Sequence, residues 1–307
     1  MAITTCPACT SSDLALYPVT KRTARVNFRC RVCGMVGWTE RPTPDLDEHG
    51  DQSTVGLDLV SVEERSKWFD TKSIESGEDL WSRALDTVDG LVGDPAGRRW
   101  YDIGAGDGKF LAMARDHGYA VRGNDLFEAA PAIARQKYDV QIDLGDLRTY
   151  DLEPQDVVSL WCVIAHNADP VSLLRAAADV LRPGGVIFLQ TPHRSAVDRA
   201  ALRALRASRG RLSHWTDRRI AAHHWFLHSP ASITKMLENA GFTDVHVEPV
   251  ALYTRSSDEY LRSMGVSAGL AKGLGRAADS AVAHGLVPRI TMTAYARRPG
   301  TLGPSPA

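Results

Sequence analysis

Residues 99–108 read RWYDIGAGDG, a short apolar strand followed directly by a turn that holds three glycines. Glycine lets the backbone turn sharply and lets a ligand approach the main chain closely. Strand-like and helix-like segments alternate after this turn, which predicts βαβ units, a mostly parallel sheet and helices on both faces. Ligands of such sheets bind beyond the carboxyl ends of the strands. We therefore expect the glycine loop to line a binding crevice.

Hydrophobic periodicity and helix-ending residues predict the other elements. We expect strands at residues 99–103, 119–124, 140–142, 156–161, 186–190, 245–250 and 290–296. We expect helices at residues 110–117, 128–137, 171–181 and 229–240. The predicted fold class is therefore α/β, with a Rossmann-like, doubly wound sheet of seven strands.

Acidic residues follow the second and third expected strands. Asp125 ends the second strand about 20 residues beyond the glycine loop, where a carboxylate can accept hydrogen bonds from both hydroxyls of a ribose. Asp146 follows the third strand, where a carboxylate can accept from an adenine amino group. Asp156 begins the apolar fourth strand, which ends at Trp161 and Cys162. The order and spacing of these three acidic residues indicate that they bind a ligand and are not simply solvated loop residues.

Residues 99 to 191 resemble the class I S-adenosylmethionine-dependent methyltransferases. The segment from Asp102 to Gly108 matches the first motif of that family, and LRPGG at 181–185 resembles the turn before its fifth strand. DVVSLWCVIAH at 156–166 resembles one branch, which commonly has glutamates where this chain has Cys162 and Ala165. HWFLHSP at 224–230 and LENAGF at 237–242 extend the resemblance. It implies S-adenosyl-L-methionine as cofactor, bound by Asp102, Gly104, Ala105, Gly106, Asp107, Gly108, Asp125, Leu126, Asp146, Leu147, Trp161 and Cys162.

A dehydrogenase is the natural alternative for a glycine-rich loop. Its nucleotide loop normally reads GxGxxG, and that spacing is absent here. The negative charge of Asp107 also suits a cationic ligand without phosphate better than a pyrophosphate, which prefers a bare helix N-terminus.

Two CxxC pairs near the N-terminus have the spacing of a four-cysteine zinc site. The ligands would be Cys6, Cys9, Cys30 and Cys33. Four thiolates complete a tetrahedron and leave no position for water, so we expect a structural zinc ribbon. Reduced cysteines without metal, or an iron–sulfur or redox site, are the alternatives.

The predicted ribbon is basic, with Lys21, Arg22, Arg25, Arg29 and Arg31. This charge allows an RNA contact, and one ribosomal RNA methyltransferase family also carries a cysteine-rich N-terminal zinc unit. The ribbon has few aromatic residues of the kind that stack on single-stranded bases. Covering the substrate cleft, or contacting a carrier protein or a second copy, are the other roles we consider.

Histidine is the best general base near neutral pH, so we sought histidines after the carboxyl ends of strands. The candidates are His166, His193, His214, His223, His224 and His228. We favour His193 and His224 as the catalytic base and retain His166, which resembles a family residue that positions cofactor or substrate. Ordinary hydrogen bonding in a loop is the alternative for each.

The segment from residue 194 to 219 is the most basic in the chain. It contains Arg194, Arg199, Arg203, Arg206, Arg209, Arg211, Arg218 and Arg219 against only Asp198 and Asp217. Arg199, Arg203 and Arg206 fall on one helical face, with Val197, Ala201 and Leu205 opposite. The segment is either an exposed amphipathic helix packed over the core or a lid that grips a substrate phosphate or carboxylate.

The length of 307 residues suits one large domain with a small accessory unit. We expect a zinc ribbon at 1–40, a linker at 41–57, a methyltransferase domain at 58–298 with a basic insertion at 194–228, and a disordered tail at 299–307. The net charge of −1 creates no global field toward nucleic acid or anionic lipid. No apolar run approaches a membrane span and the start lacks signal-peptide features, so we expect a cytoplasmic protein with no membrane partner.

The sequence thus predicts a methyltransferase for a small or carrier-bound molecule of secondary or sugar metabolism, most simply at oxygen, with nitrogen or carbon as other acceptors. Two alternatives remain. One is an RNA methyltransferase guided by the ribbon, and the other is a non-catalytic S-adenosylmethionine-binding scaffold.

Overall fold

The computed structural model describes residues 3–17, 27–38, 76–212, 224–250, 258, 266–283 and 288–300. Several predictions fall outside these residues. They concern the linker at 41–57, the tail from 301, and Lys21, Arg22, Arg25, His214, Asp217, Arg218, Arg219 and His223.

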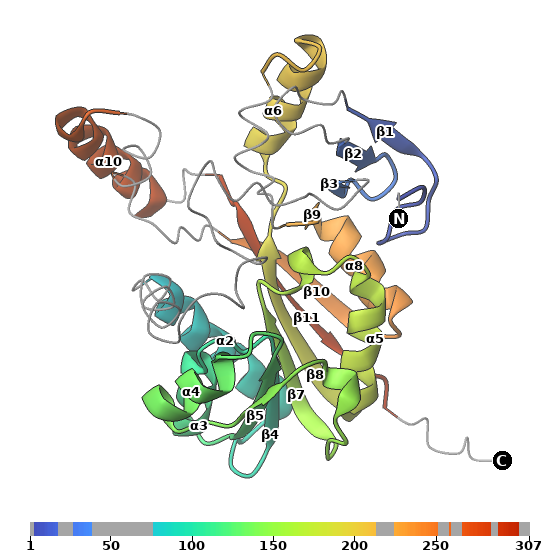
Figure 1. The fold of residues 1–307 in the computed structure, drawn as a ribbon, viewed down its shortest axis with the longest axis vertical. Helices are drawn as coiled ribbons and strands as arrows, with labels where there is room; N and C mark the ends of the chain where they lie inside the picture. Colours follow the sequence, from blue (N-terminus) through green and yellow to red (C-terminus); the bar gives the residue numbers. More distant parts are fainter. Residues whose placement is uncertain are drawn as a thin grey trace.

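A seven-stranded sheet forms the larger part of the molecule (Figure 1). Its order is β10-β11-β8-β7-β4-β5-β6, in which β11 is antiparallel to both neighbours and β4 to β8 are parallel. The strands are β4 (Arg99–Ile103), β5 (Ala120–Asp125), β6 (Ile142–Leu144), β7 (Gln155–Trp161), β8 (Leu181–Pro192), β10 (Thr243–Val250) and β11 (Thr291–Arg297). The strand order reverses between β4 and β7, which is where doubly wound sheets bind ligands. The predicted α/β class is confirmed.

Helices cover both faces of this sheet (Figure 1). On one face lie α2 (Ser76–Val92), α3 (Lys109–Asp116) and α4 (Ala130–Tyr138), and on the other lie α5 (Pro170–Val180) and α8 (Pro230–Asn239). Trp100 and Phe110 centre the first core layer, whereas Leu174 and Met236 belong to the second. A further helix, α10 (Ala268–Ala283), was not predicted from the sequence.

A second sheet joins the N-terminal segment to the basic insertion. It contains β1 (Leu14–Leu16), β2 (Asn27–Cys30), β3 (Val36–Trp38) and β9 (Phe226–Leu227), paired antiparallel in that order. Gly37 pairs with Phe226, and a Cβ on Gly37 would lie 2.5 Å from both the Phe226 ring and the Trp225 carbonyl oxygen. Phe28 and Met35 also share a core with the α5 and α8 face. The division into domains stays a prediction. The second sheet combines three strands of the predicted ribbon with β9 from the predicted insertion.

The helix α6 (Ala196–Ala207) packs on this second sheet. It begins with a capping box in which Ser195 and Asp198 exchange hydrogen bonds. Leu202 and Leu205 lie against Tyr17, Val36, Trp38 and Leu227. The predicted amphipathic helix is present with its arginines exposed, but its buried face is Asp198, Ala201, Leu202 and Leu205. Val197 is 50% exposed, so its predicted place on the packed face was wrong.

Candidate functional site

The glycine loop at the end of β4 has a backbone that other residues adopt only under strain. Gly104, Gly106 and Gly108 all have left-handed backbones, with φ values of 71°, 59° and 82°. A Cβ on Gly104 would lie 2.5 Å from Cγ2 of Val163, and one on Gly108 would lie 2.6 Å from Cγ2 of Val140. The absence of side chains on Gly104 and Gly108 therefore lets the loop pack directly against Val163 and Val140.

Asp125 holds this loop from the end of β5. Its Oδ2 accepts a hydrogen bond from the Gly106 amide at 2.8 Å, and its Oδ1 accepts from the Phe127 amide at 2.9 Å. The amides of Gly104 and Ala105 both donate to the Asn124 carbonyl oxygen, at 2.8 and 2.9 Å. Asp125 thus ties the glycine loop to the segment that follows β5.

Asp102 lies beneath the loop rather than on its surface. It is 1% exposed, and its Oδ1 accepts from the Ser159 hydroxyl at 2.6 Å, which in turn accepts from the Trp100 indole at 2.7 Å. Burial raises the pKa of Asp102 to about 8, although the Ser159 hydrogen bond acts in the opposite direction. Its carboxyl group therefore supports the strand pair β4–β7 from inside the core.

The residues predicted on the adenine side occupy different environments. Leu126 is 74% exposed, whereas Leu147 is 2% exposed and packs in the core. Both Asp146 carboxylate oxygens accept from the Arg148 guanidinium, at 2.8 and 2.6 Å. The Arg148 hydrogen bonds lower the pKa of Asp146 to about 2. An adenine amino group would thus share Asp146 with Arg148.

The end of β7 turns sharply after an aromatic cluster. The Trp161 ring packs against Trp81, Phe110 and Phe188, and its indole nitrogen has no hydrogen-bond partner among the described residues. Cys162 follows with a left-handed φ of 59°, and its amide donates to the Gln190 carbonyl oxygen at 2.9 Å. The aromatic contact of Trp81, on α2, was missed because that helix precedes every methyltransferase-like motif.

His166 and His224 lie together, and His193 is not part of their group. The two rings have centroids 4.6 Å apart, and the ligand atoms of Cys162, His166 and His224 all lie within 4.8 Å of one another. Nδ1 of His193 lies 2.6 Å from the Arg289 carbonyl oxygen, and burial lowers its pKa. The structure therefore separates the candidate bases into two places.

His228 is fully buried beside the bridge that its backbone forms with His193. Both ring nitrogens lack a hydrogen-bond partner among the described residues. Burial lowers the pKa of His228 to about 3, so the ring is neutral in the folded protein at pH 7. A neutral, enclosed ring suits a structural role better than that of an exposed base.

Four arginines line a cavity of about 150 Å³ between the second sheet and α6. The lining residues are Tyr17, Arg29, Arg194, Arg199, Leu202 and Arg203. Burial, together with the charges of Arg29 and Arg199, lowers the pKa of Arg194, and its Nε has no hydrogen-bond partner in the described part of the chain. Arg29 was predicted only as part of the basic ribbon, and Tyr17 was missed, because both come from a part of the chain far from the arginine-rich segment.

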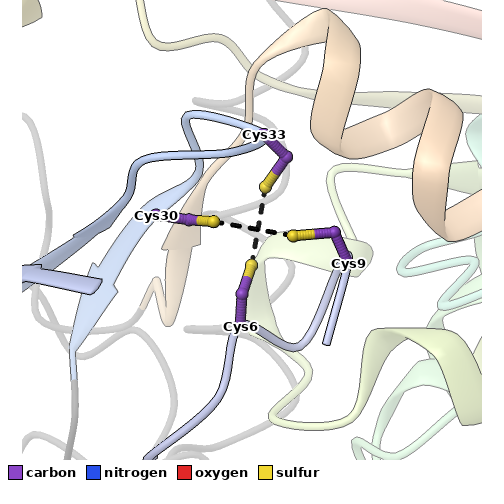
Figure 2. A group of neighbouring side chains, drawn as sticks. All are labelled: Cys6, Cys9, Cys30 and Cys33. Atoms are coloured by element: carbon purple, nitrogen blue, oxygen red, sulfur yellow. Dashed lines mark hydrogen bonds between the residues drawn. The ribbon is translucent and has the colours of Figure 1, made fainter. Parts of the chain in front are cut away.

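The four N-terminal cysteines point toward a common centre (Figure 2). Sγ of Cys6 lies 3.5 Å from Sγ of Cys33, and Cys9 and Cys30 form an equal pair. All four sulfur atoms lie within 4.8 Å of one another. The hydrogen bond between Cys6 and Cys33 lowers the pKa of the Cys6 thiol to about 5 and raises the pKa of the Cys33 thiol, so the two sulfur atoms share a proton.

Curated proteins of similar sequence match the central part of the chain. Ubiquinone biosynthesis O-methyltransferases are 30% identical over 141 residues in Marinobacter nauticus, covering 42% of this chain and 59% of that protein. The Acinetobacter baumannii relative is 28% identical over 157 residues, covering 47% and 66%. The chain thus spans less than two thirds of the length of these relatives.

Solved structures share the fold. Haemonchus contortus phosphoethanolamine N-methyltransferase 2, in complex with S-adenosyl-L-methionine, has a TM-score of 0.52 at 17% identity, covering 87% of this chain and 64% of that one. A methyltransferase complexed with the Haloferax volcanii Trm112 methyltransferase activator also has a TM-score of 0.52 at 17% identity, covering 79% and 100%. At this identity the likeness shows the fold alone.

A family model described as a methyltransferase domain matches residues 76–247. The match includes the glycine loop, Asp125 and β7, and extends over more than half of the chain. The chain belongs to this methyltransferase-domain family.

Proposed function

We propose that the chain transfers a methyl group from S-adenosyl-L-methionine to an oxygen atom of a small or carrier-bound molecule. The family match over residues 76–247 carries the proposal. The relatives named as O-methyltransferases support oxygen as the acceptor.

The loop geometry supports this cofactor. Asp125 anchors the loop through two amides at the carboxyl end of β5, where a carboxylate suits a ribose, while exposed Leu126 offers an apolar surface to an adenine ring. When bound, the cofactor would supply the activated methyl group on a sulfonium, so the protein has mainly to align the acceptor and remove its proton.

Calorimetry with S-adenosylhomocysteine tests the cofactor site. Loss of two hydrogen bonds to a charged group costs about 3–6 kcal/mol. Asp125→Ala should therefore weaken binding by at least 100-fold, whereas Asp151→Ala, at an exposed acid, should bind like the parent protein. Equal affinity in the two variants would refute the role of Asp125, and no binding by the parent protein would refute the proposed function.

We propose that the four-cysteine group holds a structural zinc ion. Tetrahedral Zn–S bonds of about 2.3 Å place sulfur atoms about 3.8 Å apart, close to the 3.5 Å pairs here. Bound zinc would hold the two CxxC pairs together, one before β1 and the other at the end of β2. Metal analysis of the purified protein, with and without Cys9→Ala, tests this role, because the variant should lose one zinc per chain.

The arginine cavity supports a substrate that carries a phosphate or carboxylate. None of its four arginines forms an ion pair with a carboxylate among the described residues. The nearby acid Asp198 is engaged by Ser195 at 2.7 Å. Arg194 directly follows His193 at the carboxyl end of β8, the edge at which ligands of this fold bind.

Calorimetry with inorganic phosphate tests the cavity. Arg194→Gln should weaken phosphate binding at least tenfold, whereas Arg135→Gln, on the exposed side of α4, should not. Equal phosphate affinity in the parent and Arg194→Gln would exclude the cavity as the anion site.

The catalytic base stays a proposal with His193 and His224 as candidates. Because burial lowers its pKa, His193 is neutral at pH 7 and able to accept a proton. Of the basic ribbon residues that the structure describes, Arg31 lies 3.3 Å from Asp13 and Arg29 lines the cavity, so these two give RNA no separate support. Detection of a methylated small molecule, but not RNA, after incubation with labelled cofactor would favour our reading over RNA methylation and over a non-catalytic scaffold.

A further inference from the structure

Cys162, His166 and His224 form a second potential ligand group, apart from the four N-terminal cysteines. Their sulfur and ring nitrogen atoms all lie within 4.8 Å of one another. We propose that these three side chains bind one zinc ion and leave its fourth coordination position to a substrate hydroxyl.

The fold brings the three ligands together from two segments of the chain. Cys162 follows β7 in a left-handed conformation, which turns the chain into the short helix η3 (Ile164–His166) that carries His166. The Trp225 amide donates to the Ala165 carbonyl oxygen at 2.7 Å, which holds His224 beside that helix. The centroids of the two imidazole rings are 4.6 Å apart, and the ring planes are tilted by 60°.

The donor set selects the kind of metal. One thiolate and two imidazoles suit zinc, whereas magnesium and calcium prefer oxygen ligands. Three protein ligands with one open position are typical of catalytic zinc sites, and four cysteines are typical of structural ones. All three side chains are only partly buried, so an ion and a substrate can reach them.

The group lies next to the glycine loop. Val163, adjacent to Cys162, is the residue whose Cγ2 leaves no room for a Cβ on Gly104. Cys162 also stands at the carboxyl end of β7, beside the reversal in strand order. A metal held there would stand at the cofactor side of the sheet.

The role of the ion in catalysis rests on the proposed function, whereas its binding does not. A substrate hydroxyl coordinated to zinc becomes more acidic and loses its proton to water. The resulting oxyanion attacks the methyl carbon, so that the new C–O bond forms as the methyl–sulfur bond breaks and the sulfonium becomes a neutral thioether. The zinc ion keeps its oxidation state. His166 and His224 would then act as ligands rather than as bases.

Metal stoichiometry tests the site. The full chain is saturated with zinc, freed of loose metal by desalting and analysed for zinc per chain. We expect two ions in the parent protein and one in Cys162→Ala and in His224→Ala, with the four-cysteine site still filled. The control His246→Ala, at an exposed histidine on β10, should keep two. Thermal melting shows whether each variant is folded, and His224→Ala decides if Cys162→Ala is not.

One zinc or fewer in the parent protein, or an unchanged count in a folded His224→Ala variant, would overturn the proposal. Two ions that fall to one in the variants, without any methyl transfer, would confirm the metal site and refute the proposed function instead. Methyl transfer at the parental rate by metal-depleted protein would refute the catalytic role of the ion.

Discussion

Gly104 is the residue at which the glycine loop meets the turn after β7. Its left-handed backbone and its approach to Val163 both require the absence of a side chain. The motif in residues 102–108 predicted a glycine turn because that requirement is local. The partner Val163 could not be predicted, because the contact depends on how β4 and β7 pair.

We predict that Gly104→Ala destabilises the fold by about 1–3 kcal/mol and weakens S-adenosylhomocysteine binding at least tenfold. The double variant Gly104→Ala/Val163→Ala should recover part of the stability, because it removes the clash but not the backbone strain. Urea denaturation and calorimetry measure both effects. No recovery in the double variant would mean that the clash contributes nothing.

His228 should make the fold sensitive to mild acid. In the folded protein the pKa of His228 is about 3, below the ordinary value of 6.5. As the pH falls below 6.5, this histidine is therefore protonated in the unfolded chain but stays neutral in the folded chain. This difference in protonation does not change the free energy of unfolding above pH 6.5, and it lowers that free energy by about 2 kcal/mol at pH 5.

The variant His228→Gln, which cannot titrate, should therefore lose about 2 kcal/mol less than the parent protein between pH 7.5 and pH 5. Urea denaturation at the two pH values gives the comparison. The same acid sensitivity in both proteins would show that His228 is not the source.

Strand β9 was not predicted from the sequence, whereas longer strands were, and the difference has a physical reason. Strands such as β4 and β7 are apolar and end in turn residues, so their bounds were predicted closely. The two residues of β9 are too few for any periodicity, and β3 selects them as a partner only in the folded chain. Strand β6 lies two residues later than predicted, because Arg122 pairs with Asp143 and lets that acid enter the strand.

We predict that Gly37→Ala separates β9 from β3 and destabilises the protein by about 1–3 kcal/mol, since the added methyl group meets backbone and ring atoms at 2.5 Å. The control Gly273→Ala, on α10, has no atom within 4 Å of the added carbon and should raise stability by about 0.5–1 kcal/mol. Urea denaturation of both variants gives the comparison. Equal stability of Gly37→Ala and the parent protein would contradict the predicted clash.

At the scale of the whole molecule, the ribbon and the larger sheet share a core. The Ser229 hydroxyl donates to the Cys33 carbonyl oxygen, and the Asn239 amide donates to the Ala8 carbonyl oxygen at 2.9 Å. Sequence predicted a separate ribbon because its CxxC pairs form a local pattern, while its contacts with α8 follow only from the tertiary fold. Among the described residues, no helix combines the length and apolar character needed to cross a bilayer.

We predict that removal of the proposed zinc ion destabilises the methyltransferase core together with the ribbon. Protein treated with a strong chelator should unfold in one transition, with a midpoint lowered on the order of 10 °C, because structural zinc binding is coupled to folding. Calorimetry measures the transition, and added zinc should restore it. Two separate transitions would show that the ribbon folds independently.

The pairing of β3 with β9 also constrains synthesis on the ribosome. One edge of β3 pairs with β2, and its other edge has β9 as its partner strand among the described residues. Residues 226 and 227 of β9 are made close to 190 residues after Trp38. At roughly 5–20 residues per second this interval lasts about 10–40 s. An unpaired edge invites pairing between nascent chains. Chains interrupted before residue 226 should therefore aggregate, and fast completion of the insertion should favour the native yield.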